Sequence, residues 1–363
     1  MTHIPAERKM IMADYKDIYY TICPVANSTY LSVHTGILKE HLNRIGYEPV
    51  RLQTLPIENW GAHFTYDNDR LFREGGNEPP LWAKSRGQDV VLIGVNISEM
   101  RQRILVRPDS DIHTIQDLRG KRLAVPVSIH AITDHHQASG LQGFSVTLEA
   151  NGIGRDEVEW VKIIDDKKLF AAREEQEANG GKPTWPPKGP IEHIEFDALE
   201  KGEVDAVYVK LSISQNLIDS GRFRELYDVA YDQNKLLPVS NEFPNVLTVS
   251  GKLAREEPRV VIEFLKADIR ASRWAFTHKE EAEKLLAEQT HGTVEEYHGS
   301  FAKDFYQRLQ PNFSGEALKG LQNRADFLLA NGFIENPVDV ESWADRSFLT
   351  QALLEVQEED EGK

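Results

Sequence analysis

The chain has 363 residues, and its 42 Lys and Arg against 58 Asp and Glu give a formal net charge of −16. This acidic balance argues against binding to nucleic acid or to an anionic membrane surface, because both depend on basic patches. Apolar residues make up 40% of the chain, which is typical of a globular protein, and the length suggests two domains. The single cysteine, Cys23, excludes an internal disulfide and a metal cage of cysteines.

The N-terminal part of the chain alternates between strand-like and helix-like patterns. Aromatic and β-branched residues predict a first strand at 18–22, and apolar residues at helical spacing predict a helix from about 28 to 45, which Gly46 ends. Further strands are predicted at 49–52 and, after an irregular stretch, at 89–95. The last of these runs is almost wholly apolar, which indicates a strand buried on both faces of a parallel sheet.

The same alternation continues through the rest of the chain. A second unit begins near 104–108. Strands are predicted at 122–126, 158–164 and 245–249, with a helix end that turns into a strand at 198–208. Helices are predicted at 114–121, 138–150 and 258–289. This order predicts an α/β fold of mainly parallel sheets flanked by helices.

Two segments depart from the alternation. The proline-rich stretch 182–190 cannot form a regular element, because proline fixes φ and lacks an N–H, so we interpret about 165–190 as a surface excursion. The acidic tail 355–361 is expected to fray. No apolar run typical of a secretory signal precedes Tyr19, and no stretch is apolar enough to span a membrane. We therefore expect a cytoplasmic protein.

Cys23 is the first candidate for chemistry. It lies in the loop that leaves the first predicted strand, just before a predicted helix N-terminus. In α/β folds, ligand-binding groups come from loops at the carboxyl ends of strands. A lone cysteine is more often an inert buried side chain, but a helix N-terminus and a nearby cation would favour its reactive thiolate form.

The second candidate is the stretch 63–81, which combines His63, Arg73 and the pair Gly75-Gly76. Glycines let backbone N–H groups approach a ligand, and the helix expected to follow adds positive potential. The arginine fork matches an oxyanion. The alternative is a loop with an exposed histidine, solvated arginines and a glycine C-cap, and composition alone favours that plainer interpretation.

The segments 117–125 and 198–206 resemble the type II periplasmic-binding-protein fold, in the branch of sulfonate-, nitrate- and thiamine-precursor-binding proteins. This resemblance implies two α/β lobes joined by a hinge, with a ligand in the cleft between them. We expect the first lobe to comprise 1–106 and 242–363, and so to carry both candidates. The second lobe is expected to comprise 107–241.

Together, the two candidate stretches resemble the 2′-hydroxybiphenyl-2-sulfinate desulfinases of dibenzothiophene desulfurisation. The matching residues are Cys23-Pro24-Val25, the block 63–81, and short matches at 307–311, 327–329 and 343–344. The resemblance implies hydrolytic C–S cleavage of an aryl sulfinate to an arene and sulfite, without a metal or an organic cofactor. It further implies Cys23 as the catalytic thiol and a substrate-binding set of His63, Phe64, Arg73, Gly75 and Gly76.

Two mechanisms remain open from the sequence. The thiol protonates the ring carbon as a general acid, or the thiolate attacks sulfur and the adduct is hydrolysed. We favour protonation, because an aryl carbanion is a very poor leaving group. Lys210 departs from the tryptophan-rich stretch of the family, so the biphenyl part of the substrate is in doubt. Lys210 either pairs with a second anionic group or points to solvent, and we favour solvent.

Two other functions share this fold. A binding protein could deliver a small organic anion, such as a sulfonate or a thiamine precursor, to a transporter. A thiamine-pyrimidine synthase would need iron and a pyridoxal cofactor, for which the sequence offers no convincing ligands. His130, His135 and His136 lack the spacing of a metal site. We expect a monomer whose partner is a small aryl sulfinate.

Overall fold

The computed structural model describes residues 15–97, 100–168, 170–180, 193–210, 212–231, 240, 243–301 and 305–362. Their strands are β1 (Lys16–Ile22), β2 (Tyr47–Arg51), β3 (Leu71–Gly75), β4 (Val90–Asn96), β5 (Gln102–Val106), β6 (Arg122–Ser128), β7 (Glu159–Asp165), β8 (Val207–Lys210), β9 (Arg224–Asp228) and β10 (Asn245–Ser250).

Helices separate most of these strands along the chain. The α-helices are α1 (Ser28–His34), α2 (Ile37–Arg44), α3 (Ala62–Thr65), α4 (Glu78–Ser85), α5 (His135–Ala150), α6 (Ala171–Ala178), α7 (Ile194–Glu200), α8 (Ser212–Asp219), α9 (Gly251–Glu256), α10 (Pro258–Thr277), α11 (Lys279–Gln289), α12 (Val294–Ser300), α13 (Gly315–Ala330), α14 (Val340–Trp343) and α15 (Arg346–Glu361). Short 3₁₀ helices are η1 (Leu52–Thr54), η2 (Ile57–Asn59), η3 (Ile115–Leu118), η4 (Val229–Tyr231) and η5 (Phe305–Arg308).

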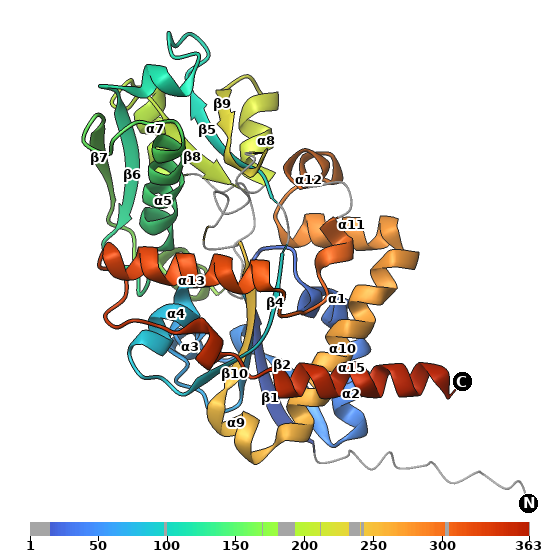
Figure 1. Cartoon of the computed structure of the whole chain (residues 1–363). Helices are drawn as coiled ribbons and strands as arrows, with labels where there is room; N and C mark the ends of the chain where they lie inside the picture. The colour runs from blue at the N-terminus through green and yellow to red at the C-terminus, as the bar shows by residue number, and fades with distance from the viewer. Residues whose placement is uncertain are drawn as a thin grey trace, which may run out of the picture.

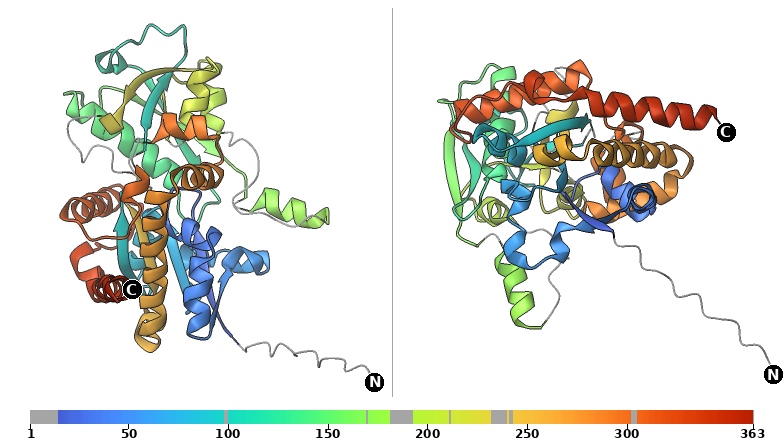
Figure 2. Two further views of the ribbon diagram at one scale, coloured as in Figure 1. Left: turned by 90° about the vertical axis from the view of Figure 1, so that its right-hand side faces the viewer. Right: turned by 90° about the horizontal axis from the view of Figure 1, so that it is seen from below.

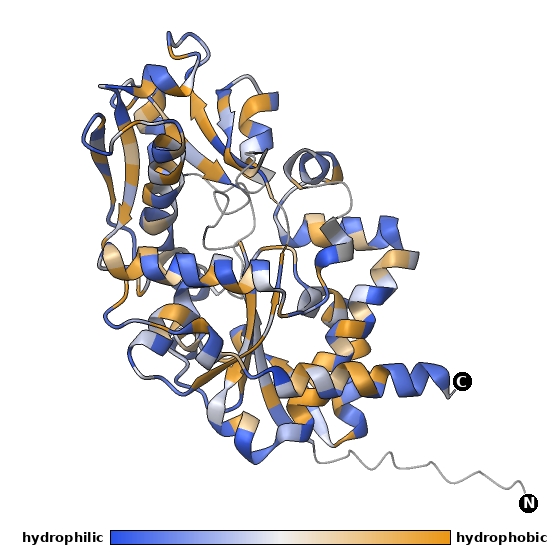
Figure 3. Cartoon of the chain, viewed as in Figure 1, coloured by the Kyte–Doolittle hydropathy of each residue, from blue (hydrophilic) through white to orange (hydrophobic). Residues whose placement is uncertain are grey.

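The larger sheet has the strand order β2-β1-β3-β10-β4 and is covered by helices on both faces (Figure 1). Successive side chains of a strand point to opposite faces, so Leu71 of β3 packs in one apolar cluster and Phe72 in another. The first cluster includes Leu321 of α13, and the second includes Phe264 of α10. Figure 3 shows hydrophobic residues concentrated in the strands between these helices.

The remaining strands form a three-stranded sheet, β8-β5-β9, and the pair β6-β7. Helix α5 packs against both β6 and β8, and its Phe144 belongs to the apolar cluster there. The chain enters this part after β4 and returns to the larger sheet at β10 (Figures 1 and 2). The predicted α/β class with sheets flanked by helices is therefore observed.

Strand direction differs from the prediction of mainly parallel sheets. β1 is parallel to β2 and β3, and β6 is parallel to β7. β10 is antiparallel to β3 and β4, and β5 is antiparallel to β8 and β9. The direction of β10 follows from the path of the chain. The chain returns to the larger sheet from the other sheets, and β10 therefore crosses that sheet in the direction opposite to β3 and β4.

The division into lobes at residues 106 and 242 stays a prediction. One strand bears on it directly: β5 falls within the expected first lobe, yet it pairs with β8 and β9, which fall within the expected second lobe.

Several predicted elements differ in extent. The helix expected at 28–45 is divided into α1 and α2, because Gly36 adopts a left-handed φ of 79° between them. The helix expected at 258–289 is divided at His278. The helix expected at 114–121 is only the 3₁₀ turn η3.

Most important for function, the irregular stretch before β4 contains α3, α4 and the fully buried strand β3.

The surface excursion is described only in part. Its helix α6 projects from the body of the molecule, as Figure 2 shows. The proline-rich 182–190 lies outside the described residues.

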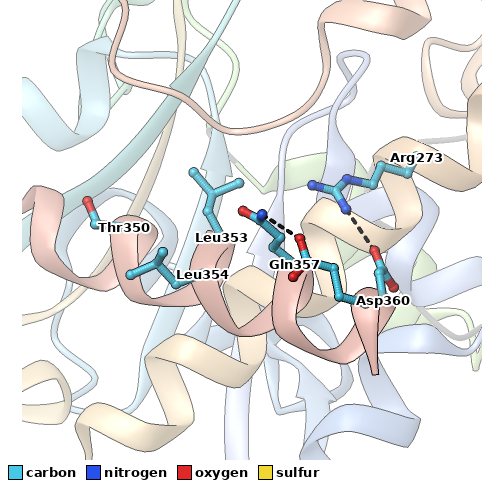
Figure 4. Close-up of a pocket in the computed structure, with 7 residues that line it drawn as sticks. Arg273, Thr350, Leu353, Leu354, Gln357 and Asp360 are labelled. Atoms are coloured by element: carbon cyan, nitrogen blue, oxygen red, sulfur yellow. Dashed lines mark hydrogen bonds and ion pairs between the residues drawn. The ribbon is translucent and has the colours of Figure 1, made fainter. Parts of the chain in front are cut away.

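The prediction that the acidic tail frays is wrong. Residues 355–361 belong to the last turns of helix α15, whose carboxylates pair with basic side chains of α10. The partners are Arg259 with Glu355, Lys266 with Glu355 and Glu359, Arg270 with Glu359 and Asp360, and Arg273 with Asp360. Figure 4 shows the Arg273–Asp360 pair beside a pocket on this helix that is also lined by Leu353 and Leu354. Charge pairing between α10 and α15, together with burial of Val356 in the apolar cluster of Phe264, thus holds this acidic segment in place.

Candidate functional site

The structure brings together three residues that the sequence analysis singled out. Cys23 follows β1, His63 lies in α3, and Arg73 lies in the middle of β3. β1 and β3 are parallel neighbours, and the Cys23 N–H donates to the Glu74 carbonyl at 3.0 Å. The Cys23 Sγ is 3.2 Å from Arg73 Nη2 and 3.6 Å from His63 Nε2. The plainer interpretation of an exposed histidine and a solvated Arg73 is wrong, because their exposed fractions are 2% and 0%.

Arg73 is a buried cation held by neutral groups. Its Nε donates to the His63 carbonyl at 3.0 Å and its Nη1 to the Gly76 carbonyl at 2.7 Å, so the Nη2 edge is directed at the Cys23 sulfur. Among the residues that the structure describes, no carboxylate forms an ion pair with Arg73. Burying a charge without a counter-charge is costly. The thiolate of Cys23, or an anionic ligand beside it, would supply the missing negative charge.

His63 is neutral in this environment. Burial lowers its pKa well below the ordinary value, and the charge of Arg73 and the neighbouring His135 lower it further. The ring packs edge-on against Phe64, with centroids 4.8 Å apart at an interplanar angle of 74°. Its Nδ1 is 2.8 Å from the Thr21 hydroxyl. A neutral imidazole acts here as a hydrogen-bonding group rather than as a cation.

The two glycines have different roles in the geometry. Gly75 has φ of 148°, and a Cβ at this position would lie 2.4 Å from the Cys23 Sγ. Only glycine therefore allows β3 to end against the thiol. The Gly76 N–H, between β3 and α4, has no acceptor among the described residues, which leaves it able to donate to a ligand. Asn77 occupies the N-cap position of α4, but its amide donates to the Ser240 and Pro244 carbonyls instead of capping the helix.

The N–H groups at the start of α1, which were expected to stabilise negative charge on Cys23, hydrogen-bond to other side chains instead. The Thr29 N–H donates to the Glu74 carboxylate at 2.7 Å, and the side chain of Asn27 accepts from the Tyr30 N–H at 2.8 Å. The cation that lies beside the Cys23 sulfur is therefore Arg73. Glu74 and Asp268 form a buried carboxyl pair bridged by Thr29, whose hydroxyl donates to Asp268 at 2.7 Å. Burial raises the pKa of both groups, that of Asp268 well above the ordinary value, and the charge of Glu74 raises it further.

Sequence reasoning missed three polar groups around the thiol. Thr21 hydrogen-bonds with His63, the Gln53 side chain donates to Thr21, and the Gln289 side chain donates to the Cys23 carbonyl. Thr21 had a signal, because side chains two residues apart on a strand share a face. Gln53 and Gln289 had none, since their positions depend on how distant elements pack.

A group of histidines extends from His63 toward the other sheets. The rings of His135 and His136 have centroids 4.4 Å apart, and those of His136 and His193 are 5.0 Å apart. Lys210 is half-buried and donates to the Ser139 hydroxyl at 3.1 Å, so the prediction that it points to solvent is wrong. Within the described part of the chain, no three His, Cys, Asp or Glu side chains are placed to hold a metal ion.

Comparisons with known proteins agree with the resemblance seen in the sequence. Residues 77–175 match the family model described as NMT1/THI5 like. The chain is 29% identical over 356 residues to the 2′-hydroxybiphenyl-2-sulfinate desulfinase of Rhodococcus erythropolis, covering 92% of this chain and 93% of that protein. It is 22% identical to a putative aliphatic sulfonates-binding protein of Bacillus subtilis, covering 79% of this chain and 74% of that protein.

Solved structures give the same picture. A crystal structure of DSZB, with one cysteine replaced by serine and in complex with biphenyl-2-sulfinic acid, superimposes with a TM-score of 0.72 at 27% identity. It covers 93% of this chain and 99% of that chain. The sulfonate-binding protein SsuA of Methylobacillus flagellatus has a TM-score of 0.67 at 18% identity, over 95% and 96% of the two chains. These likenesses confirm the predicted fold class.

One further property concerns the helices. Within the described residues, none combines the length and the apolar character that crossing a membrane requires.

Proposed function

We propose that this chain is a desulfinase, which hydrolyses the C–S bond of an aryl sulfinate to release an arene and sulfite, with Cys23 as its catalytic thiol. The observation that carries the proposal is the buried Arg73 guanidinium, which lacks a carboxylate partner among the described residues and lies 3.2 Å from the Cys23 sulfur. Such an arrangement favours a negative charge at this point. The similarity to the Rhodococcus desulfinase over 92% of the chain supports the same reaction.

The sulfinate is a permanent anion, so a dehydrated site must supply donors for its oxygens. In the proposal, Gly76 N–H is the backbone donor, because it has no acceptor among the described residues. Arg73 and His63 complete the anion site, and Gly75 lets the backbone approach. Phe64, which packs edge-on against the His63 ring, is proposed to contact the substrate.

Cys23 acts as a general acid. The thiol gives its proton to the ring carbon as the C–S bond breaks, and the electron pair of that bond forms the new C–H bond. Sulfur dioxide departs and takes up water to give bisulfite and a proton, and this proton restores the thiol. Negative charge develops on the Cys23 sulfur during the first step, where Arg73 Nη2 donates to it at 3.2 Å. Donors already in place at the developing charge lower the barrier.

The alternative is attack of the thiolate on the sulfinate sulfur. A proton must then be supplied to the leaving aryl carbon, and a Cys23–SO₂ adduct forms before hydrolysis. Mass spectrometry of rapidly quenched enzyme separates the two routes. The nucleophilic route predicts a covalent adduct on Cys23, whereas the general-acid route predicts none.

The proposed function is tested by assaying sulfite release from aryl sulfinates with the wild type and with Cys23→Ser. We expect turnover to be lost and binding of the aryl sulfinate, measured by calorimetry, to be retained. Equal sulfite release from both proteins would remove Cys23 from the mechanism. Binding without turnover in the wild type would instead favour a carrier of small organic anions, the function of the sulfonate-binding relatives.

The cytoplasmic location and the monomeric state remain predictions that accompany this proposal. Cell fractionation tests the first, and analytical ultracentrifugation tests the second.

A further inference from the structure

A chain of three polar side chains ends at the candidate catalytic thiol. Gln53, in η1, donates from Nε2 to the Thr21 hydroxyl at 2.8 Å. The same hydroxyl is 2.8 Å from His63 Nδ1, and the opposite ring nitrogen, Nε2, is 3.6 Å from the Cys23 sulfur. Gln53, Thr21 and His63 are all buried, so water does not substitute for these contacts at low cost.

The direction of this chain follows from the number of protons that Thr21 carries. A hydroxyl has one hydrogen to donate and two lone pairs to accept with. The Thr21 oxygen accepts a hydrogen bond from Gln53 Nε2–H. Its own O–H is then left to donate, and His63 Nδ1 is the acceptor within reach among the described residues. A neutral imidazole that accepts at Nδ1 carries its proton on Nε2. His63 therefore presents an N–H to the Cys23 sulfur. Arg73 Nη2 is 3.5 Å from the same nitrogen, but it is a donor as well, so its hydrogen bond goes to the sulfur and not to His63.

We propose that Gln53 is a positioning residue, which acts through Thr21 to hold His63 in the tautomer that donates Nε2–H to the Cys23 sulfur. The sulfur then faces two donors, since Arg73 Nη2 donates to it at 3.2 Å. A thiol in this setting has its own proton directed away from both donors. The thiolate left after proton transfer is stabilised by both. This inference deepens the proposed function, but the tautomer itself can be measured without any substrate.

The orientation of the Gln53 amide decides the outcome. Its Oε1 is buried and has no hydrogen-bond partner among the described residues. If the amide presented this oxygen to Thr21, the hydroxyl would donate to Gln53 and accept from His63 Nδ1–H. A bare Nε2 would then face the sulfur, and the second donor would be lost. A residue far from the reacting atoms thus sets which hydrogen bond the thiol receives.

Two substitutions separate this role from simple packing. In Gln53→Met the amide donor is gone, so the Thr21 hydroxyl is free either to donate to His63 Nδ1 or to accept from it, and a mixture of the two tautomers is expected. In Gln53→Glu the carboxylate can only accept, so it takes the Thr21 O–H and reverses the chain. If Gln53 served only to pack, Gln53→Glu would disturb the His63 tautomer less than Gln53→Met, because glutamate preserves the shape of glutamine more closely than methionine does.

The primary measurement is the ¹⁵N spectrum of the histidine rings, with His63 assigned by its loss in His63→Gln. We expect an unprotonated Nδ1 in the wild type, a protonated Nδ1 in Gln53→Glu, and signals of both tautomers in Gln53→Met. A protonated Nδ1 in the neutral ring of the wild type would overturn the inference, whether or not any variant folds. The same tautomer in Gln53→Glu as in the wild type would also overturn it.

The second measurement is the pH dependence of Cys23 alkylation by iodoacetamide, which needs no turnover. Loss of the Nε2–H donor is expected to slow alkylation at neutral pH by about tenfold in Gln53→Glu, because a hydrogen bond to the charged sulfur is lost. The new charge acts through space as well, so the double variant Thr21→Val with Gln53→Glu is the control. If alkylation is slowed equally in the double variant, which lacks the Thr21 hydroxyl, Gln53 does not act through Thr21 and the inference is contradicted. If these results hold while sulfite release is absent, the proposed function fails and the inference stands.

Discussion

Replacement of Gly75 by alanine tests whether close contact between β3 and the thiol is essential. The added Cβ would lie 2.4 Å from the Cys23 Sγ and 2.5 Å from its Cβ, so Cys23 must move. Overpacking of this kind costs about 1–3 kcal/mol. A side chain at φ of 148° adds about 1–3 kcal/mol of backbone strain. We therefore expect Gly75→Ala to lower the free energy of unfolding by about 2–6 kcal/mol.

Two other glycines separate these contributions. Gly46 has φ of 85° with no atom within 4 Å of an added Cβ, so Gly46→Ala measures backbone strain alone, about 1–2 kcal/mol. Gly61 has φ of −55° and equally open space, so Gly61→Ala is expected to be neutral or slightly stabilising. Urea unfolding gives the free energies, and sulfite release gives the activity.

Activity should fall only in Gly75→Ala, because only that Cβ displaces the sulfur from Arg73 and His63. The reasoning fails if Gly75→Ala loses no more stability than Gly46→Ala and releases sulfite at the wild-type rate.

Three other substitutions probe charge around the site. Arg73→Ala should weaken aryl sulfinate binding by about 2–5 kcal/mol, measured by calorimetry, because it removes a desolvated cation. If Lys210 pairs with a second anionic group, Lys210→Met should lower kcat/KM for a carboxylated aryl sulfinate, with a loss of about 1.5–3 kcal/mol in transition-state stabilisation, and leave kcat/KM for a plain aryl sulfinate unaffected. Asp268→Asn should flatten the pH dependence of urea unfolding. Because the pKa of Asp268 is raised in the folded state, its contribution to stability is fully present below its pKa in the unfolded chain. That contribution is lost as the pH rises through its pKa in the folded protein.

Each of these predictions has an outcome that contradicts it. Unchanged affinity in Arg73→Ala would remove the guanidinium from the anion site. An equal loss on both sulfinates would show that Lys210 supports the fold rather than the choice of substrate. For Asp268→Asn, a slope of stability against pH equal to that of the wild type would mean that this carboxyl does not titrate with folding.

The sequence alone determined the local features of this protein. The aromatic and β-branched run before Cys23 predicted β1, and the residues after it placed Cys23 in a loop before a helix, as observed. The order of strands and helices predicted the α/β class. These predictions succeeded because they depend on side-chain periodicity and backbone preferences over a few neighbouring residues.

Tertiary structure decided which groups surround the thiol. β3 went unrecognised because Arg73 and Glu74 interrupt its apolar pattern, and their burial becomes tolerable only through partners supplied by other elements. The N–H of Thr29 at the start of α1 donates to Glu74, and Lys210 donates to Ser139. Gln53 donates to Thr21, which lies 32 positions earlier in the chain. Hydrogen bonds between such distant residues follow from sheet register and helix packing, which local sequence patterns do not encode.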